Sequence, residues 1–330
     1  MAKRILLLVL LSISLNIFAA QKINGAGATF PYPLYSKWFA EYTKTHKDVE
    51  FNYQSIGSGG GIKQVLAGTV DFGATDAPMS DDELKQAKNP IAHIPTVLGA
   101  VTVAYNVKGV ATGLKLDGET LANIFLGAIT KWNDAAIAKL NPKAKLPATD
   151  ILVVRRSDGS GTTSIFSTFL AAVSADFKTK VGAGKNVTWP AGVGAKGNEG
   201  VTALVSQTEG AIGYVELAYA VENKLAVAAV KNLKGDFVTP AVESISKAAS
   251  NIKDGNGDLR ISVINSDVKG AYPISSFTWI LLPDDKNSAA LKEVRAFLGW
   301  AMKDGQKMAP ALQYAPLPKK LAESLIKKVK

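Results

Sequence analysis

Three short turns combine glycine with hydroxyl side chains in a pattern that could bind an anion. They are Gly25-Ala-Gly-Ala-Thr-Phe30, Ser55-Ile-Gly-Ser-Gly-Gly-Gly61 and Arg155-Arg-Ser-Asp-Gly-Ser-Gly-Thr-Thr163. A helix is expected to begin at each, opened by Thr29 and Phe30, by Ser58 and Gly59, and by Ser160-Gly-Thr162. Free N–H groups and the positive end of the helix dipole attract an oxyanion there. One such turn is usually only a helix cap, but three of them indicate an anion site.

Two adjacent arginines begin the third turn, and they are expected to have different roles. A guanidinium offers a planar pair of N–H donors that matches two oxygens of a tetrahedral oxyanion. If strand alternation continues through Arg155 and Arg156, the two side chains point to opposite sides. We assign Arg156 to the anion site and Arg155 to the surface.

Other chemistries fail on composition or spacing. The chain has no cysteine, which excludes thiol nucleophiles, disulfides and iron–sulfur clusters. It lacks the P-loop and the dinucleotide-binding fingerprint, and neither Ser58 nor Ser160 lies in Gly-x-Ser-x-Gly. We interpret His46 as exposed polarity at a helix end and His93 as lying in an apolar context, so neither is expected to be catalytic. The lysines near the C-terminus have no interleaved aromatics of the kind that nucleic-acid binding needs.

The segments around these turns follow an α/β pattern. Helices are expected over residues 31–45, 62–67, 121–140 in two pieces, 161–173, 289–303 and 317–329, and strands over 49–53, 70–74, 97–107, 151–154, 211–215 and 274–282. Strand, polar turn, helix and strand in succession are typical of a mostly parallel sheet. Residues 182–200 and 231–238 are expected to be loops or hairpin tips. No clean linker separates two domains, which favours two domains joined by several crossings.

Length, composition and the N-terminus describe an exported protein. The 330 residues are 47% hydrophobic and 20% charged, enough for two globular domains. Lys3 and Arg4 precede an apolar stretch over residues 5–18, which is shorter than a membrane span. We predict a signal peptide cleaved after Ala19, with an N-terminal membrane anchor as the alternative. Cleavage would remove two positive charges and lower the net charge from +10 to +8. With no cysteine for lipid attachment, a periplasmic location is expected.

Several motifs together resemble the periplasmic phosphate-binding protein family of high-affinity phosphate ABC transporters. They include the three turns, Val70-Asp-Phe-Gly-Ala-Thr-Asp-Ala-Pro, Trp189-Pro-Ala-Gly-Val-Gly-Ala-Lys-Gly-Asn, Gly210-Ala-Ile-Gly-Tyr-Val-Glu and Tyr314-Ala-Pro-Leu-Pro. The resemblance implies an α/β, two-lobed periplasmic binding protein of type II, a Venus-flytrap with two crossover strands. Lobe 1 would hold residues 20–100 and 272–330, and lobe 2 residues 101–271, with one phosphate in the cleft between them.

The resemblance also implies a ligand set and partners. The family's phosphate ligands match Thr29, Phe30 through its backbone amide, Ser58, Asp76, Arg156, Ser160, Gly161 and Thr162, with Asp158 supporting the arginine. One departure is Gly59, where the family often has a second serine. The implied partners are the permease subunits and the ATPase of the transporter. We expect a monomer that is not an enzyme and that needs no cofactor, metal or nucleic acid.

Asp76 indicates that the expected anion carries a proton. A carboxylate repels an anion unless the ligand carries a proton that the carboxylate can accept. Phosphate near neutral pH has such a proton and sulfate does not, so Asp76 would discriminate against sulfate. Two alternatives remain open, namely a secreted phosphoryl-transfer enzyme that uses the same turns and a binding protein for sulfate or molybdate. Neither the histidines nor the carboxylates cluster as the first would require.

Overall fold

The computed structural model describes residues 20–252 and 257–329, and it is built on one long sheet. The strands lie in the order β2-β1-β3-β12-β4-β8-β6-β7, and β9 pairs with β4. Their bounds are β1 Gln21–Gly27, β2 Val49–Ser55, β3 Phe72–Thr75, β4 Ile91–Asn106, β6 Leu152–Arg156, β7 Val193–Ala195, β8 Ala211–Glu216, β9 Ala226–Val227 and β12 Ser275–Pro283. The predicted signal peptide, residues 1–19, lies outside the described residues.

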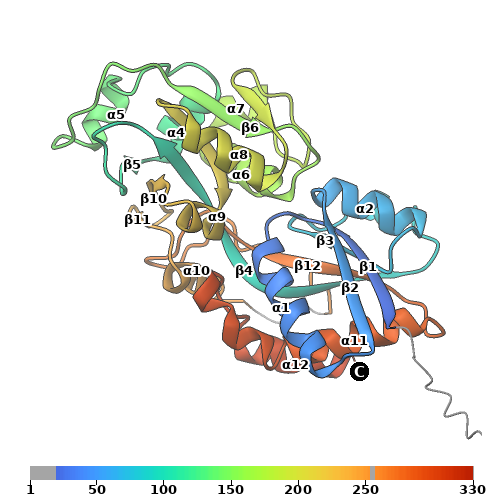
Figure 1. The fold of residues 1–330 in the computed structure, drawn as a ribbon. Helices are drawn as coiled ribbons and strands as arrows, with labels where there is room; N and C mark the ends of the chain where they lie inside the picture. Colours follow the sequence, from blue (N-terminus) through green and yellow to red (C-terminus); the bar gives the residue numbers. More distant parts are fainter. Residues whose placement is uncertain (1–19, 253–256, 330) are drawn as a thin grey trace, which may run out of the picture.

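Strand β4 joins two halves of this sheet. Residues 91–100 pair with β12, whereas residues 101–106 pair with β8. Almost all of its side chains are buried. Strands β2, β1, β3 and β12 therefore lie on one side of the molecule and β8, β6 and β7 on the other, as Figure 1 shows.

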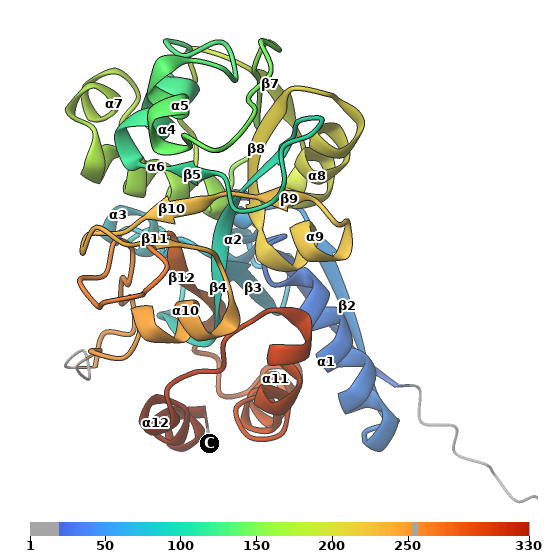
Figure 2. The same cartoon turned by 90° about the vertical axis from the view of Figure 1, so that its left-hand side faces the viewer.

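The first half of the sheet is covered by helices from both ends of the chain. These are α1 (Tyr32–Thr45), α2 (Ser58–Ala67), the short α3 (Asp81–Leu84), α11 (Ala289–Ala301) and α12 (Lys319–Val329). Helix α1 packs beside α11, and in Figure 2 α11 and α12 lie at the end of the molecule away from α4 and α5. Phe39 of α1 stacks on Phe51 at 4.7 Å and meets Phe297 of α11 at 5.1 Å between ring centroids. This aromatic packing holds α1 and α11 against β2 in the first half of the sheet.

The second half has its own helices and core. The helices are α4 (Gly118–Phe125), α5 (Ala135–Leu140), α6 (Gly161–Val173), α7 (Ala175–Lys180), α8 (Gly197–Gln207), α9 (Leu217–Glu222) and α10 (Val242–Ala248). A small separate sheet contains β5 (Lys115–Leu116), β10 (Ala229–Lys231) and β11 (Phe237–Val238). Phe166 of α6 stacks on Tyr214 of β8 at 4.5 Å and meets Phe125 of α4 edge-on, which holds α6 against the sheet.

Most expected elements are confirmed, but three expectations are wrong. Strand β1 was missed because Gly25-Ala-Gly27 is typical of a turn, yet it is a strand that pairs with β2 on one side and β3 on the other. Helix α8 begins inside the expected loop 182–200, and β4 starts six residues before Val97. In each case long-range pairing or packing overrides the local pattern. No helix in the described part of the chain is both long and apolar enough to cross a bilayer.

Candidate functional site

The predicted anion-binding residues come together where the two halves of the sheet meet. Ser58 is the first residue of α2, Asp76 follows β3, Arg156 ends β6 and Ser160 is the N-cap of α6. Parallel strands commonly build ligand sites at their carboxyl ends. All of the predicted side chains are buried, with exposed fractions of 2% for Thr29, 0% for Ser58, 2% for Asp76, 4% for Arg156, 0% for Ser160 and 0% for Thr162.

One turn differs from its expected helix position. Helix α1 begins at Tyr32, and Pro31 is its N-cap instead of its first helical residue. Thr29 and Phe30 therefore lie in a tight turn before the helix, closed by a bond from the Tyr32 amide to the Thr29 carbonyl. The Tyr314 hydroxyl donates to the Phe30 carbonyl at 2.6 Å. This bond fixes the backbone at Phe30, the residue whose amide is the predicted ligand.

The turns from the two halves are in direct contact. The Gly59 amide donates to the Gly159 carbonyl at 2.8 Å. At Gly161, a Cβ atom would lie only 2.4 Å from Ser58 Oγ and 2.6 Å from Asp76 Oδ2. Only a glycine allows α6 to approach α2 this closely. Because the first amides of a helix have no acceptor within the helix, the N–H groups of Gly161 and Thr162 remain available for an anion.

Arg156 is held by Asp158 and keeps donors free. Its Nε donates to Asp158 Oδ1 at 2.7 Å, its Nη2 to Oδ2 at 2.5 Å and its Nη1 to Thr162 Oγ1 at 3.3 Å. Burial alone would raise the pKa of Asp158, but the bonds and charge of Arg156 outweigh it and lower this pKa. Of the five guanidinium N–H groups, two are then left for a ligand. The ion pair leaves little net charge, so an anion would be bound mainly by hydrogen bonds.

Asp76 is a buried carboxyl group among donors. Thr278 of β12 donates to its Oδ1 at 2.8 Å, and Ser58 Oγ lies 3.4 Å from its Oδ2. Burial raises the pKa of Asp76 to about 7, although the Thr278 bond and the Arg156 charge oppose this rise. Asp76 can therefore hold or accept a proton near neutral pH.

Asn198, near the start of α8, is a central residue that the sequence analysis missed. Its Nδ2 donates to Thr29 Oγ1 at 2.7 Å and to Thr162 Oγ1 at 3.1 Å. The backbone N–H of Asn198 also donates to Thr29 Oγ1. Its side-chain Oδ1 accepts from the backbone N–H of Glu216, which fixes the orientation of the side-chain amide. Asn198 ends the Trp189–Asn198 motif, so a signal was present but carried no assigned role.

These bonds determine what the two threonine hydroxyls can do. Thr29 Oγ1 accepts from Asn198 twice, and Thr162 Oγ1 accepts from Asn198 and from Arg156. Each oxygen has two lone pairs, so both are used as acceptors. Each hydroxyl can then only donate its hydrogen. The hydroxyl groups of Thr29 and Thr162 are thus two hydrogen-bond donors suited to a ligand with many acceptor atoms, such as an oxyanion.

A partly buried ion pair also connects the two halves. Lys185, in the loop after α7, places its Nζ 2.9 Å from Glu83 Oε2 of α3. Burial would raise the pKa of Glu83, but the hydrogen bond and charge of Lys185 and the hydrogen bonds of Ser80 together lower it. Sequence reasoning missed this pair, because 102 residues separate its members.

The remaining sequence expectations have mixed outcomes. Arg156 is buried and Arg155 is half-buried instead of lying fully at the surface, and its Nε lacks a hydrogen-bond partner among the described residues. His46 is half-buried and stacks on Tyr42 at 3.9 Å, which corrects its expected exposure. His93 is buried and accepts from the Met79 amide, and burial lowers its pKa to about 4. In the described ranges no group of three or more His, Asp or Glu side chains is arranged to hold a metal ion.

This fold and site define a solute-binding protein of the PBP superfamily. The model of the PBP superfamily domain matches residues 18–304. The chain is 48% identical over 307 residues to phosphate-binding protein PstS of Xylella fastidiosa strain Temecula1, covering 92% of this chain and 84% of that one. It is 44% identical over 329 residues to PstS of Pasteurella multocida strain Pm70, covering 98% and 95%. The chain therefore belongs to the PstS family of phosphate-binding proteins, which are components of ABC transport and not enzymes.

Solved structures support the fold. A high-affinity periplasmic phosphate-binding protein bound with phosphate, PfluDING, has a TM-score of 0.73 at 24% identity, covering 92% of this chain and 93% of that chain. A putative phosphate ABC transporter substrate-binding protein with bound phosphate from Clostridium perfringens has a TM-score of 0.66 at 18% identity, covering 90% and 100%. Both structures share the two-lobed fold of this chain.

Proposed function

We propose that this protein binds one inorganic phosphate ion, mono- or dibasic, in the cleft between its two halves and delivers it to the permease of a phosphate ABC importer. The assignment rests on family membership and on the buried donors described above. The proposed ligands are Thr29, the Phe30 amide, Ser58, Asp76, Arg156, Ser160, Gly161 and Thr162, with Asp158 supporting Arg156.

The proposal includes a closing movement about β4. Lobe 1 would hold residues 20–100 and 272–330, and lobe 2 residues 101–271. The pairing of β4 with β12 up to Ala100 and with β8 from Val101 supports this division. One phosphate would contact both lobes and so favour the closed form. We further propose that the protein is a monomeric periplasmic component, exported by a cleavable signal peptide, and that it serves a permease driven by an ATPase.

The observation that carries the phosphate assignment is the carboxyl group of Asp76. It is buried beside donors suited to an anion, and above its pKa of about 7 it is a carboxylate that can only accept hydrogen bonds. A fully deprotonated ligand such as sulfate would face this acceptor without a hydrogen to offer. A phosphate O–H would satisfy it, and a missing donor in such a site is costly.

Calorimetric titration of the phosphate-stripped protein with phosphate and, separately, with sulfate tests the assignment. We expect one phosphate site and at least about a hundredfold weaker sulfate binding. Asp76→Asn should narrow this ratio by at least tenfold, whereas Asp82→Asn, at an exposed carboxylate, should leave it unchanged. An unchanged ratio in Asp76→Asn would refute the role of Asp76. Tight sulfate binding by the wild type, or turnover of a generic phosphoester, would refute the function.

A further inference from the structure

The positive charge of this protein is concentrated near its C-terminus. Residues 288–330, which contain α11 and α12, hold nine Lys or Arg and three Asp or Glu, a net charge of +6. Residues 20–287 hold 27 and 25, a net charge of +2. Most of the charge excess of the chain after residue 19 thus lies in this C-terminal segment, which the proposed phosphate site does not use.

The cationic side chains of these helices are exposed or half-buried, and several surround one groove. Lys292 and Arg295 of α11, with Lys303 just after this helix, line a groove of about 650 Å³, whose other wall includes Ile326 and Val329 of α12. Helix α12 buries its apolar side and exposes its lysines. We call this surface the basic face, and it consists of Lys292, Arg295, Lys303, Lys319, Lys320, Lys327 and Lys328.

Few acidic groups neutralise the basic face. The Glu293 carboxylate accepts from the Tyr42 hydroxyl at 2.6 Å, and Asp304 pairs with Lys307 at 2.7 Å. Glu323 lies 4.0 Å from Lys319, and Asp284 lies 3.4 Å from Arg295. Five of the lysines form no ion pair with any residue that the structure describes, namely Lys292, Lys303, Lys320, Lys327 and Lys328. Their charge therefore faces the solvent.

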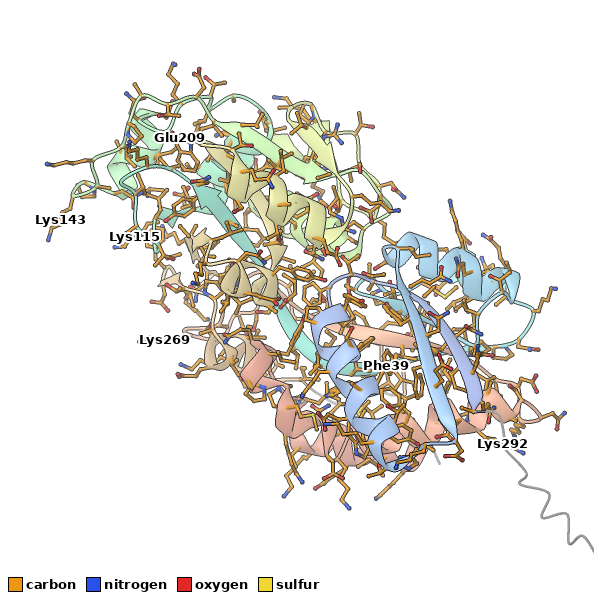
Figure 3. The ribbon with its side chains drawn as sticks, in the orientation of Figure 1. Phe39, Lys115, Lys143, Glu209, Lys269 and Lys292 are labelled. Carbon is orange, nitrogen blue, oxygen red and sulfur yellow. The ribbon has the colours of Figure 1, made fainter. Side chains whose placement is uncertain are left out.

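The basic face also lies away from the candidate site. Figures 1 and 2 both place α11 and α12 at the end of the molecule opposite α4 and α5, whereas the site lies where α2 meets α6. Figure 3 shows Lys292 at this end and Lys143 at the other. A partner bound to the basic face would leave the phosphate cleft free.

We propose that the basic face binds the anionic surface of a phospholipid bilayer. Flexible lysines spread over two helices do not form a fixed fork for one ligand, but they match an extended, fluid array of lipid phosphates. Lysine and arginine near such a surface are attracted within a Debye length. Their aliphatic stems can lie along the apolar wall of the groove while the ammonium groups reach the lipid phosphates. This contact goes beyond the proposed function, because it would keep the protein close to the membrane that contains its permease.

Flotation of the phosphate-loaded protein with vesicles tests this proposal. We compare vesicles of phosphatidylglycerol and phosphatidylcholine in equal parts with vesicles of phosphatidylcholine alone, in a buffer without added phosphate. Partitioning onto the anionic vesicles should be at least about tenfold stronger and should fall at least about tenfold when salt rises from 20 to 300 mM. Equal binding to both vesicle types, or no binding at 20 mM salt, would overturn the proposal.

Two matched variants locate the contact. The first changes Lys292, Lys303, Lys327 and Lys328 to Gln; the second changes Lys108, Lys139, Lys143 and Lys145 to Gln, all of them exposed and in the other half. Both lose four charges, but only the first should lose at least about tenfold in vesicle partitioning. Equal losses would mean that net charge and not the basic face is responsible, which would overturn the proposal. Unchanged phosphate titrations verify that both variants fold.

Discussion

At the scale of single residues, the site depends on which groups donate and which accept. The backbone N–H and the side-chain amide of Asn198 both donate to Thr29 Oγ1, and the side-chain amide also donates to Thr162 Oγ1. With the bond from Arg156 to Thr162 Oγ1, this leaves each threonine hydroxyl able only to donate its hydrogen. Asn198 would act through these threonines and not as a phosphate ligand itself.

Asn198→Ala should weaken phosphate binding by about ten- to a hundredfold, because the hydroxyl groups of Thr29 and Thr162 each lose the side-chain amide that donates to them. Calorimetric titration measures this change. Asn287→Ala is the control, since Asn287 is exposed in the loop between β12 and α11. A change of less than twofold in Asn198→Ala would contradict the orienting role.

The raised pKa of Asp76 predicts a pH dependence of stability. In the folded, phosphate-free protein this pKa is about 7, against an ordinary value of 3.8. Between these values the folded state binds more protons than the unfolded state, so stability from this group falls as pH rises and levels off above about pH 7. The free energy of unfolding of Asp76→Asn relative to wild type should increase by about 2 to 3 kcal/mol from pH 5 to pH 8. Denaturant titrations at several pH values that give a constant difference would contradict this.

At the scale of elements, the site depends on helix N-termini that approach one another closely. The backbone at Gly57, the N-cap of α2, has a φ of 86°, and a Cβ there would lie 2.2 Å from Asp158 Oδ2. The start of α2 can therefore meet the turn before α6 only with glycine at this position. The same spatial limit applies to Gly161 at the start of α6.

Gly161→Ala should abolish high-affinity binding, with a loss of at least about a hundredfold, because its methyl group would occupy the space between Ser58 and Asp76. The protein should still fold, since the contact is between the two halves. Gly299→Ala in α11 is the matched control. It meets no heavy atom within 4 Å, so it should leave binding unchanged and stabilise the helix by roughly 1 kcal/mol. Full affinity in Gly161→Ala would show that α2 and α6 need not meet.

At the scale of the whole molecule, the pair between Lys185 and Glu83 connects the two halves beside the predicted site, where the Ser160 amide donates to the Lys185 carbonyl at 2.9 Å. Its side chains are only 17% and 25% exposed, so water screens the pair less than a surface pair. The Gly59–Gly159 backbone bond acts across the same junction. Both contacts would break when the lobes open.

Lys185→Met should increase the dissociation rate of phosphate about fivefold and leave the association rate nearly unchanged, because it removes a contact of the closed form. Stopped-flow measurements after mixing with a phosphate trap determine the rate. The control is Lys180→Met, whose partner Asp176 lies on the same helix. An equal dissociation rate in wild type and Lys185→Met would mean that this ion pair does not hold the lobes together.

Local signals were enough to predict much of this protein. Glycine with hydroxyl side chains after a strand indicated the starts of α2 and α6, and strand alternation separated buried Arg156 from Arg155. These features depend on backbone preferences and on neighbours within a few residues. The same local reasoning failed at β1, where small residues resemble a turn and only pairing on both sides makes a strand.

The tertiary structure decided which distant residues support the site. Asn198 meets Thr29 across 169 residues, Thr278 reaches Asp76 across 202 and Lys185 reaches Glu83 across 102. No spacing in the sequence predicts such pairs, because they depend on how distant segments pack. The sheet order, for example, places β12 with Thr278 beside β3, which Asp76 follows. The sequence by itself determined the types of group that can bind an anion. Only the folded chain determined how those groups are oriented and buried, since both depend on contacts between segments that are far apart in sequence.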